Sequence, residues 1–166
     1  MGYSILPYDK KYDKSTFSCG VPPLDDYLQK QAGQDMRKHY AALFVAVDEE
    51  ARIVGYYTLS NASIPLLDIP ENMKKKLPKY ADVPAIRLGR LAVDKRAQGQ
   101  GLGADLLADA VFRAVSNVSA WTVLVVDAKD ETAVAFYQKF GFAKLLDDDR
   151  HLYIMRQSIE DFLQGV

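Results

Sequence analysis

The chain has 166 residues, of which 49% are apolar and 26% charged, and this composition is typical of one ordinary globular domain. Its formal net charge of -1 excludes a uniformly basic surface, so a nucleic-acid partner would have to bind a local patch. The single cysteine, Cys19, excludes an internal disulfide and fits a reducing compartment.

The first half of the chain alternates between strand and helix patterns. A short strand around Ile5 precedes a helix that Pro22 and Pro23 open, because a missing N–H does no harm in a first helical turn. Residues 41–47 and 52–59 are rich in apolar, aromatic and β-branched residues and predict two strands. Residues 61–84 hold four prolines and predict a long irregular stretch, which in a small domain is usually functional or mobile.

The second half predicts three further strands, over residues 86–93, 121–126 and 151–155. Apolar residues spaced along one face predict a helix that begins at Leu102. Asp130 is placed to cap a shorter helix, which Gly141 ends. This order predicts a mixed α/β sheet with helices on its faces, and we expect residues 1–166 to form one domain.

The glycine-dense segment after the strand at 86–93 predicts an anion site. Residues 90–109 read RLAVDKRAQGQGLGADLLAD, which is a strand, a turn with three glycines and an amphipathic helix. Glycines let a backbone approach an anion closely, and the first turn of a helix offers unpaired N–H groups. The segment lacks the Gly-Lys-Ser/Thr of a Walker loop and the glycine spacing of a Rossmann turn. The remaining alternative is a helix start that binds no ligand.

The same segment resembles the R/Q-x-x-G-x-G/A signature of GNAT acetyltransferases through Gln98, Gly101 and Gly103. The later run from Phe136 to Phe142, FYQKFGF, is similar to the F-Y-x-x-x-G-F segment of that family. The runs FSCG at 17–20, IVGYYTLS at 53–60 and LGRLAVD at 88–94 resemble one subgroup, the bacterial GNAT toxins that acetylate aminoacyl-tRNA. The resemblance therefore implies a GNAT fold, in which a mixed sheet splays into a V.

The resemblance also implies how acetyl-CoA would bind. The cofactor would lie between the strands at 86–93 and 121–126, held by strand backbone, by the pyrophosphate turn and by one aromatic side chain. These expected cofactor residues are Leu91, Ala92, Val93, Gln98, Gly99, Gln100, Gly101, Leu102, Gly103, Ala104 and Phe136. No metal site is expected.

Tyr137 is the expected general acid, which would protonate the departing thiolate of CoA. Helical spacing alone would instead make it a core aromatic beside Ala133, Phe136 and Phe140, and the family resemblance favours catalysis. No general base is obvious, because the sequence places no partner for His39 or His151, and we expect both to be surface or structural residues. An α-amine, with a pKa near 8, needs less help to lose a proton than a lysine does, so the missing base favours an α-amine acceptor.

A local basic patch is the candidate tRNA surface. Its residues are Lys74, Lys75, Lys76, Arg87, Arg90, Lys95 and Arg96. Arg87 and Arg90 are three apart on a strand and point to opposite faces, so at least one is expected to pair elsewhere.

Three functions stay open at this point. The toxin subgroup implies acetylation of the α-amino group of aminoacyl-tRNA, a ribbon-helix-helix antitoxin and a homodimer. The alternatives are a GNAT enzyme for protein or small-molecule amines, and an acyl-CoA-binding module without chemistry. No segment is long and apolar enough for a membrane helix and no signal pattern opens the chain, so we expect a cytoplasmic protein.

Overall fold

The computed structural model describes residues 2–165 and divides them into two compact units. One unit comprises residues 2–60 with 89–114, and the other comprises residues 61–88 with 115–165. The strands form one seven-stranded sheet in the order β1-β2-β3-β4-β5-β7-β6, with parallel and antiparallel pairs. The predicted mixed α/β class is therefore confirmed.

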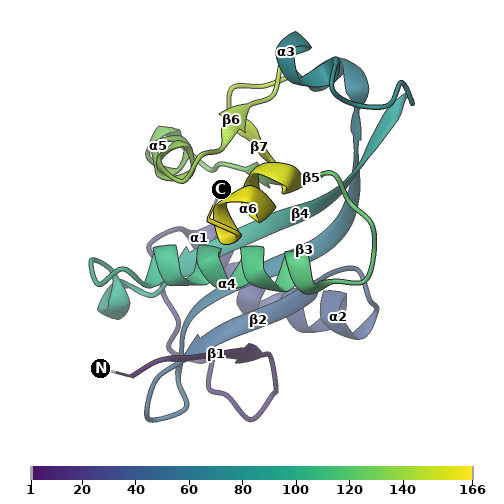
Figure 1. Cartoon of the computed structure of the whole chain (residues 1–166). Helices are drawn as coiled ribbons and strands as arrows, with labels where there is room; N and C mark the ends of the chain where they lie inside the picture. Colours follow the sequence, from purple (N-terminus) through teal and green to yellow (C-terminus); the bar gives the residue numbers. More distant parts are fainter. Residues whose placement is uncertain (1, 166) are drawn as a thin grey trace. The chain divides into compact units, whose positions relative to one another are not determined.

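The helices and strands are labelled in chain order in Figure 1. Their bounds are β1 Ser4–Pro7, α1 Pro22–Lys30, α2 Ala32–Arg37, β2 Ala42–Val47, β3 Ile53–Pro65, η1 Leu66–Asp68, α3 Glu71–Lys74, β4 Asp82–Val93, η2 Lys95–Ala97, α4 Leu102–Ser116, β5 Val123–Asp127, α5 Glu131–Lys139, β6 Ala143–Lys144, β7 His151–Met155 and α6 Arg156–Leu163, where η marks a short 3-10 helix.

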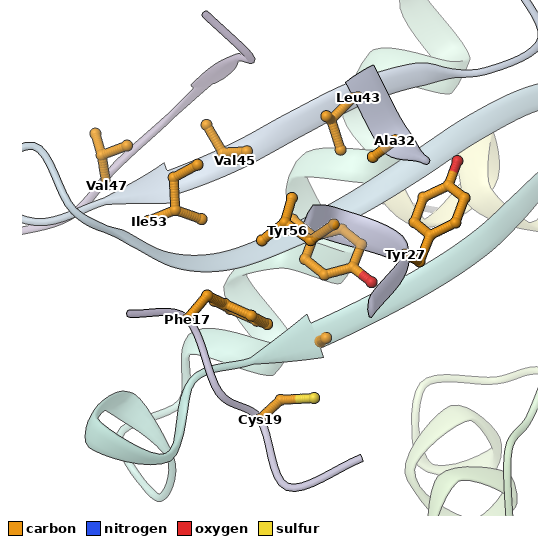
Figure 2. Packing of buried hydrophobic residues seen from close by; sticks show 11 residues of the cluster. Phe17, Cys19, Tyr27, Ala32, Leu43, Val45, Val47, Ile53 and Tyr56 are labelled. Carbon is orange, nitrogen blue, oxygen red and sulfur yellow. The ribbon is translucent and has the colours of Figure 1, made fainter. Parts of the chain in front are cut away.

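The first unit is built on three antiparallel strands, β1, β2 and the first part of β3, which lie side by side (Figure 1). Pro22 and Pro23 occupy the first positions of α1, as predicted. A cluster of buried side chains from these strands, from α1 and α2 and from the N-terminal segment forms the core of this unit (Figure 2).

Tyr56 is the central aromatic residue of that cluster. Its ring packs edge-on against Phe17, with ring centres 5.6 Å apart, and its hydroxyl donates a 2.6 Å hydrogen bond to the carbonyl of Leu24. Figure 2 shows Phe17 and Cys19 on the N-terminal segment beside this tyrosine. The core thus ties that segment to α1 and β3.

The second unit is organised around β5. Residues Ala85–Leu88 of β4 pair with it in parallel, and β7 pairs with it antiparallel on its other side. Val83, Val123 and Val125 pack with Ile69 and Tyr153 in a second buried cluster. The short strand β6 extends this unit beyond β7.

The structure corrects the predicted irregular stretch at residues 61–84. That prediction is wrong at both ends, because β3 continues to Pro65 and β4 already begins at Asp82. The prediction treated the prolines as signs of irregular structure. Pro65 instead ends a strand, and Pro84 is an exposed residue of β4 between buried Val83 and Ala85. The strand predicted at 121–126 is found at Val123–Asp127, and α2, α3, β6 and α6 were not predicted. No helix within residues 2–165 is long and apolar enough to cross a membrane.

Candidate active site

The glycine turn is anchored at its entrance by Asp94, which follows β4 and is almost completely buried. The Asp94 carboxylate accepts hydrogen bonds from the backbone N–H of Ser18, at 2.9 Å, and from the backbone and guanidinium of Arg96. Burial alone would raise the pKa of Asp94, but these hydrogen bonds outweigh it and hold the pKa below its usual value. Asp94 therefore fixes the start of the turn as a charged group.

The side chain of Gln98 holds the glycine turn through two hydrogen bonds to backbone carbonyls. Its side-chain amide donates to the carbonyls of Val93, at 2.9 Å, and Cys19, at 3.0 Å. The side chain of this signature residue thus ties the end of β4 to the N-terminal segment. Only the backbone of Gln98 remains for the anion contact that the sequence predicted.

The turn itself provides room and donors for an anion. Gly99 and Gly101 have φ angles of 78° and 82°, and a Cβ added at either would meet no atom within 4 Å. The first backbone hydrogen bond of α4 that leaves the turn runs from the N–H of Asp105 to the carbonyl of Gly101, so the N–H groups of the first helical turn, which begins at Leu102, point towards the glycine turn. Open glycines, unpaired N–H groups and the positive end of a 15-residue helix together fit a pyrophosphate.

The side chains at the end of β4 alternate between half-buried and buried, as expected for a strand with one covered face. Ala92 is buried in the core of the first unit, whereas Leu91 and Val93 are half-buried. Backbone contacts to the cofactor at Leu91 and Val93 stay a prediction, and the carbonyl of Val93 already accepts from Gln98.

Tyr137 lies on α5 in the second unit, a helix that Asp130 caps as predicted. Its ring contacts those of Phe136 and Phe142 and is buried. Its hydroxyl forms no hydrogen bond with a described residue. Every fully buried side-chain oxygen or nitrogen among these residues has a hydrogen-bond partner, so the Tyr137 hydroxyl is not fully buried and keeps access to solvent. Burial, and then the charge of Asp127, raise the pKa of Tyr137 above its usual value, so the phenol stays protonated at neutral pH.

Several predicted substrate-binding cations are already paired within the chain. Arg87 binds both oxygens of Asp127 at 3.0 Å, and Arg96 binds Asp94. The guanidinium of Arg90 stacks 3.6 Å above the ring of Tyr27. Arg87 thus pairs with an acid while Arg90 makes a different contact, as their opposite directions predicted.

The lysines of the patch also differ in whether they are already paired with a carboxylate. Lys74 forms a 2.6 Å ion pair with Glu71 on α3. Lys75, Lys76 and Lys95 are exposed and form no salt bridge with a described residue. Together with Arg90, which contacts an aromatic ring and forms no salt bridge with a described residue, these three carry the uncompensated charge of the predicted patch.

Sequence reasoning missed a polar cluster at the end of β5. His151 Nδ1 lies 2.8 Å from Asp147, and His151 Nε2 lies 3.8 Å from Asp127. His151, for which the sequence offered no partner, therefore has two carboxylate neighbours. The spacing of Asp147 to His151 was visible in the sequence, but the register that sets Asp127 opposite His151 was not. Among residues 2–165, no group of three or more His, Cys, Asp or Glu could hold a metal ion.

Comparison with known proteins adds a family to this geometry. The profile of the acetyltransferase (GNAT) domain matches residues 19–151. A "tRNA-acetylating toxin" of Mycobacterium tuberculosis is 37% identical over 145 residues, which cover 86% of each chain.

Three solved structures are similar over nearly the whole chain. A tyrosine-to-phenylalanine mutant of KacT has a TM-score of 0.90 at 30% identity, with 98% of this chain and 99% of that chain covered. AtaT complexed with acetyl-methionyl-tRNAfMet has a TM-score of 0.88 at 31% identity, with 98% of each chain covered. An AtaT tyrosine-to-phenylalanine mutant bound to the C-terminus of the antitoxin AtaR and acetyl-CoA has a TM-score of 0.82 at 26% identity, with 97% of this chain and 98% of that chain covered.

Proposed function

Because this chain belongs to the GNAT acetyltransferase family, we propose that it transfers the acetyl group of acetyl-CoA to the α-amino group of an aminoacyl-tRNA and acts as a translation-blocking toxin. The observation that carries this proposal is the 37% identity to a tRNA-acetylating toxin over 86% of both chains. A neighbour solved with acetyl-methionyl-tRNAfMet supports the same acceptor class.

Acetyl-CoA supplies the activated acetyl thioester, and the glycine turn is its proposed anchor. The backbone N–H groups of residues 98–104 would bind the pyrophosphate, since the open faces of Gly99 and Gly101 leave room for it. Leu91, Ala92, Val93 and Phe136 are proposed to contact the rest of the cofactor, and a backbone N–H on β4 would polarise the acetyl carbonyl.

Tyr137 is the proposed general acid. Its solvent-accessible hydroxyl can donate a proton to the thiolate that leaves when the acceptor amine displaces it. The raised pKa keeps this proton on the phenol throughout the range in which an α-amine is neutral. Tyrosine-to-phenylalanine mutants among the neighbouring toxins fit a tyrosine of special importance.

The acceptor RNA is proposed to bind the basic patch. Lys75, Lys76 and Lys95 carry exposed, uncompensated charge, and Lys74, Arg87, Arg90 and Arg96 are proposed to assist once their present contacts rearrange.

Regulation and assembly complete the proposal. We propose that a ribbon-helix-helix antitoxin neutralises the protein, because a neighbour binds the C-terminus of its antitoxin. We also propose a homodimer in the cytoplasm, and a single domain over residues 1–166, since β3 and β4 each contribute residues to both units. Met1 and Val166 lie outside the described residues. Light scattering, alone and with a co-expressed antitoxin, tests the assembly.

The function is tested by incubating the protein with total aminoacyl-tRNA and acetyl-CoA that carries a radiolabelled acetyl group. We expect label on the RNA, and a loss of about 100-fold or more in rate for Tyr137→Phe with acetyl-CoA binding retained. Sequencing the labelled RNA would name the acceptor. Label on proteins or free amines instead would replace the acceptor in this proposal, and Tyr137→Phe with the wild-type rate would remove Tyr137 from the mechanism.

A further inference from the structure

A hollow of about 150 Å³ in the second unit lies where the parallel pairing of β4 and β5 ends. Leu88 and Val126 are the last paired residues, and Arg87 and Asp127, which line the hollow, lie beside them. Ligands of open α/β sheets bind outside the carboxyl ends of parallel strands, often where neighbouring strands diverge. The hollow therefore occupies a favourable place in this fold.

The floor of the hollow is apolar and its rim is charged. Ile64, Val125 and Leu145 line it and also belong to the buried cluster around β5. The volume suits an amino-acid-sized group and is far too small for a nucleotide.

The charges at the rim favour a cation over a phosphate. The hollow is lined by three carboxylates, those of Asp68, Asp127 and Asp147, and by one guanidinium, that of Arg87. The carboxylate of Asp127 and the ring of His151 are both partly exposed, so an incoming ligand can reach them. An excess of negative charge attracts an ammonium group and repels a phosphate backbone.

His151 is held with one ring nitrogen directed towards Asp127. Its Nδ1 lies 2.8 Å from the Asp147 carboxylate, which accepts only, so Nδ1 carries a proton and Nε2 of the neutral ring is an acceptor. Asp127 and His151 are direct partners on the antiparallel strands β5 and β7 and their side chains share one face. The 3.8 Å between Nε2 and Asp127 is too long for a hydrogen bond, but a nitrogen between them could lie about 2.9 Å from both.

We propose that this hollow binds the acceptor's α-ammonium group between Asp127 and His151, and that His151 removes its proton. This assignment rests on the proposed function. The ammonium N–H bond breaks, its proton moves to Nε2, and a neutral amine and an imidazolium result. The imidazolium then returns the proton to water. Asp127 is the anchor of the amine, and Asp147 positions the base.

Two further observations agree with this assignment. The hydrogen bond that His151 donates to Asp147 raises the pKa of His151 above its usual value, and the charges of Asp127, Asp147 and Asp148 add to this shift, although burial opposes it. The charge of Asp127 also contributes, after burial, to the raised pKa of Tyr137, and both residues belong to the second unit.

Steady-state kinetics with total aminoacyl-tRNA as the varied acceptor test the assignment in three variants of the full chain. Asp127→Asn keeps the shape and removes the charge. His151→Asn keeps a donor for Asp147 at the position of Nδ1 and removes Nε2. Asp149→Asn is the matched control, because Asp149 is an exposed residue of the same loop outside the hollow.

We expect Asp127→Asn to raise the KM for aminoacyl-tRNA about tenfold and to leave the KM for acetyl-CoA within about twofold. His151→Asn should lower kcat about 100-fold near pH 7.5, where a neutral imidazole is available, and much less at pH 9, where the amine is already neutral. If Asp127→Asn does not fold because Arg87 loses its partner, the pH profile of His151→Asn decides alone.

Two results would overturn the assignment in distinguishable ways. Variants with the kinetics of Asp149→Asn beside an active wild type would refute the amine site alone. A wild type that labels no aminoacyl-tRNA would refute the proposed function and this assignment with it.

Discussion

At the scale of single residues, the two proposed proton carriers are set up in opposite ways. Burial raises the pKa of Tyr137, so this phenol keeps its proton and acts only as a donor. The pKa of His151 is raised as well, but for an imidazole this shift moves the titration towards neutral pH, where the ring can both take up and release a proton. An acid and a base are thus distinguished by side-chain chemistry and surroundings.

Asp94 gives a prediction about stability. We expect Asp94→Asn to lower the free energy of unfolding by about 2 kcal/mol at pH 7, because charge-assisted hydrogen bonds to Arg96 and Ser18 are lost. The pKa of Asp94 is lower in the folded chain, so its contribution is fully present above the unfolded-state value near 3.8 and is lost as the pH falls through the folded-state value. Urea unfolding at pH 7 and at about pH 3 should therefore show the gap between wild type and variant shrinking in acid.

Asp149→Asn is the control for this comparison, because Asp149 is exposed and forms no ion pair with a described residue. A gap of the same size at both pH values would mean that Asp94 acts through its shape and not through its charge.

At the scale of elements, the sequence predicted best the structures that local chemistry determines. The Pro22–Pro23 helix start, the Asp130 cap and the strand from His151 to Met155 depend on neighbouring residues and were predicted correctly. The end of β3 and the start of β4 were not, because prolines argued against strands that pairing in the sheet nevertheless stabilises.

The same division runs through the candidate site. The glycine turn could be predicted because its residues are contiguous. The hollow could not, because Arg87, Asp127 and His151 meet only through the register of three strands. Its one local signal was the i, i+4 spacing of Asp147 and His151.

The glycine turn gives the prediction at this scale. Gly101→Glu adds a side chain and a negative charge where the pyrophosphate is proposed to bind, and we expect a loss of at least about 100-fold in acetyl-CoA affinity, or about 2.7 kcal/mol, by calorimetry. Gly165→Glu is the matched control, because Gly165 also has a positive φ, of 74°, and open space around it. Equal affinities in the two variants would place the pyrophosphate elsewhere.

At the scale of the whole molecule, the net charge of -1 gives no overall attraction for RNA. Where RNA can bind is then determined by which lysines and arginines are not already paired with carboxylates. Intramolecular ion pairs already neutralise Arg87, Arg96 and Lys74 to a large extent. The proposed binding of RNA would therefore depend on cations such as Lys75 and Lys76, whose charge is exposed and uncompensated.

The salt dependence of tRNA binding tests this view. Each lysine-phosphate contact contributes about 0.7–0.9 to the slope of log affinity against log salt, so Lys75→Ala with Lys76→Ala should lower that slope by about 1.5. Lys30→Ala is the control and should change it far less, because Lys30 lies on α1 outside the proposed patch and forms an ion pair with Asp26. Filter binding of tRNA between about 50 and 200 mM salt measures all three proteins. A double variant with the wild-type slope would show that the RNA lies on another face, since counterion release from these two lysines would then play no part.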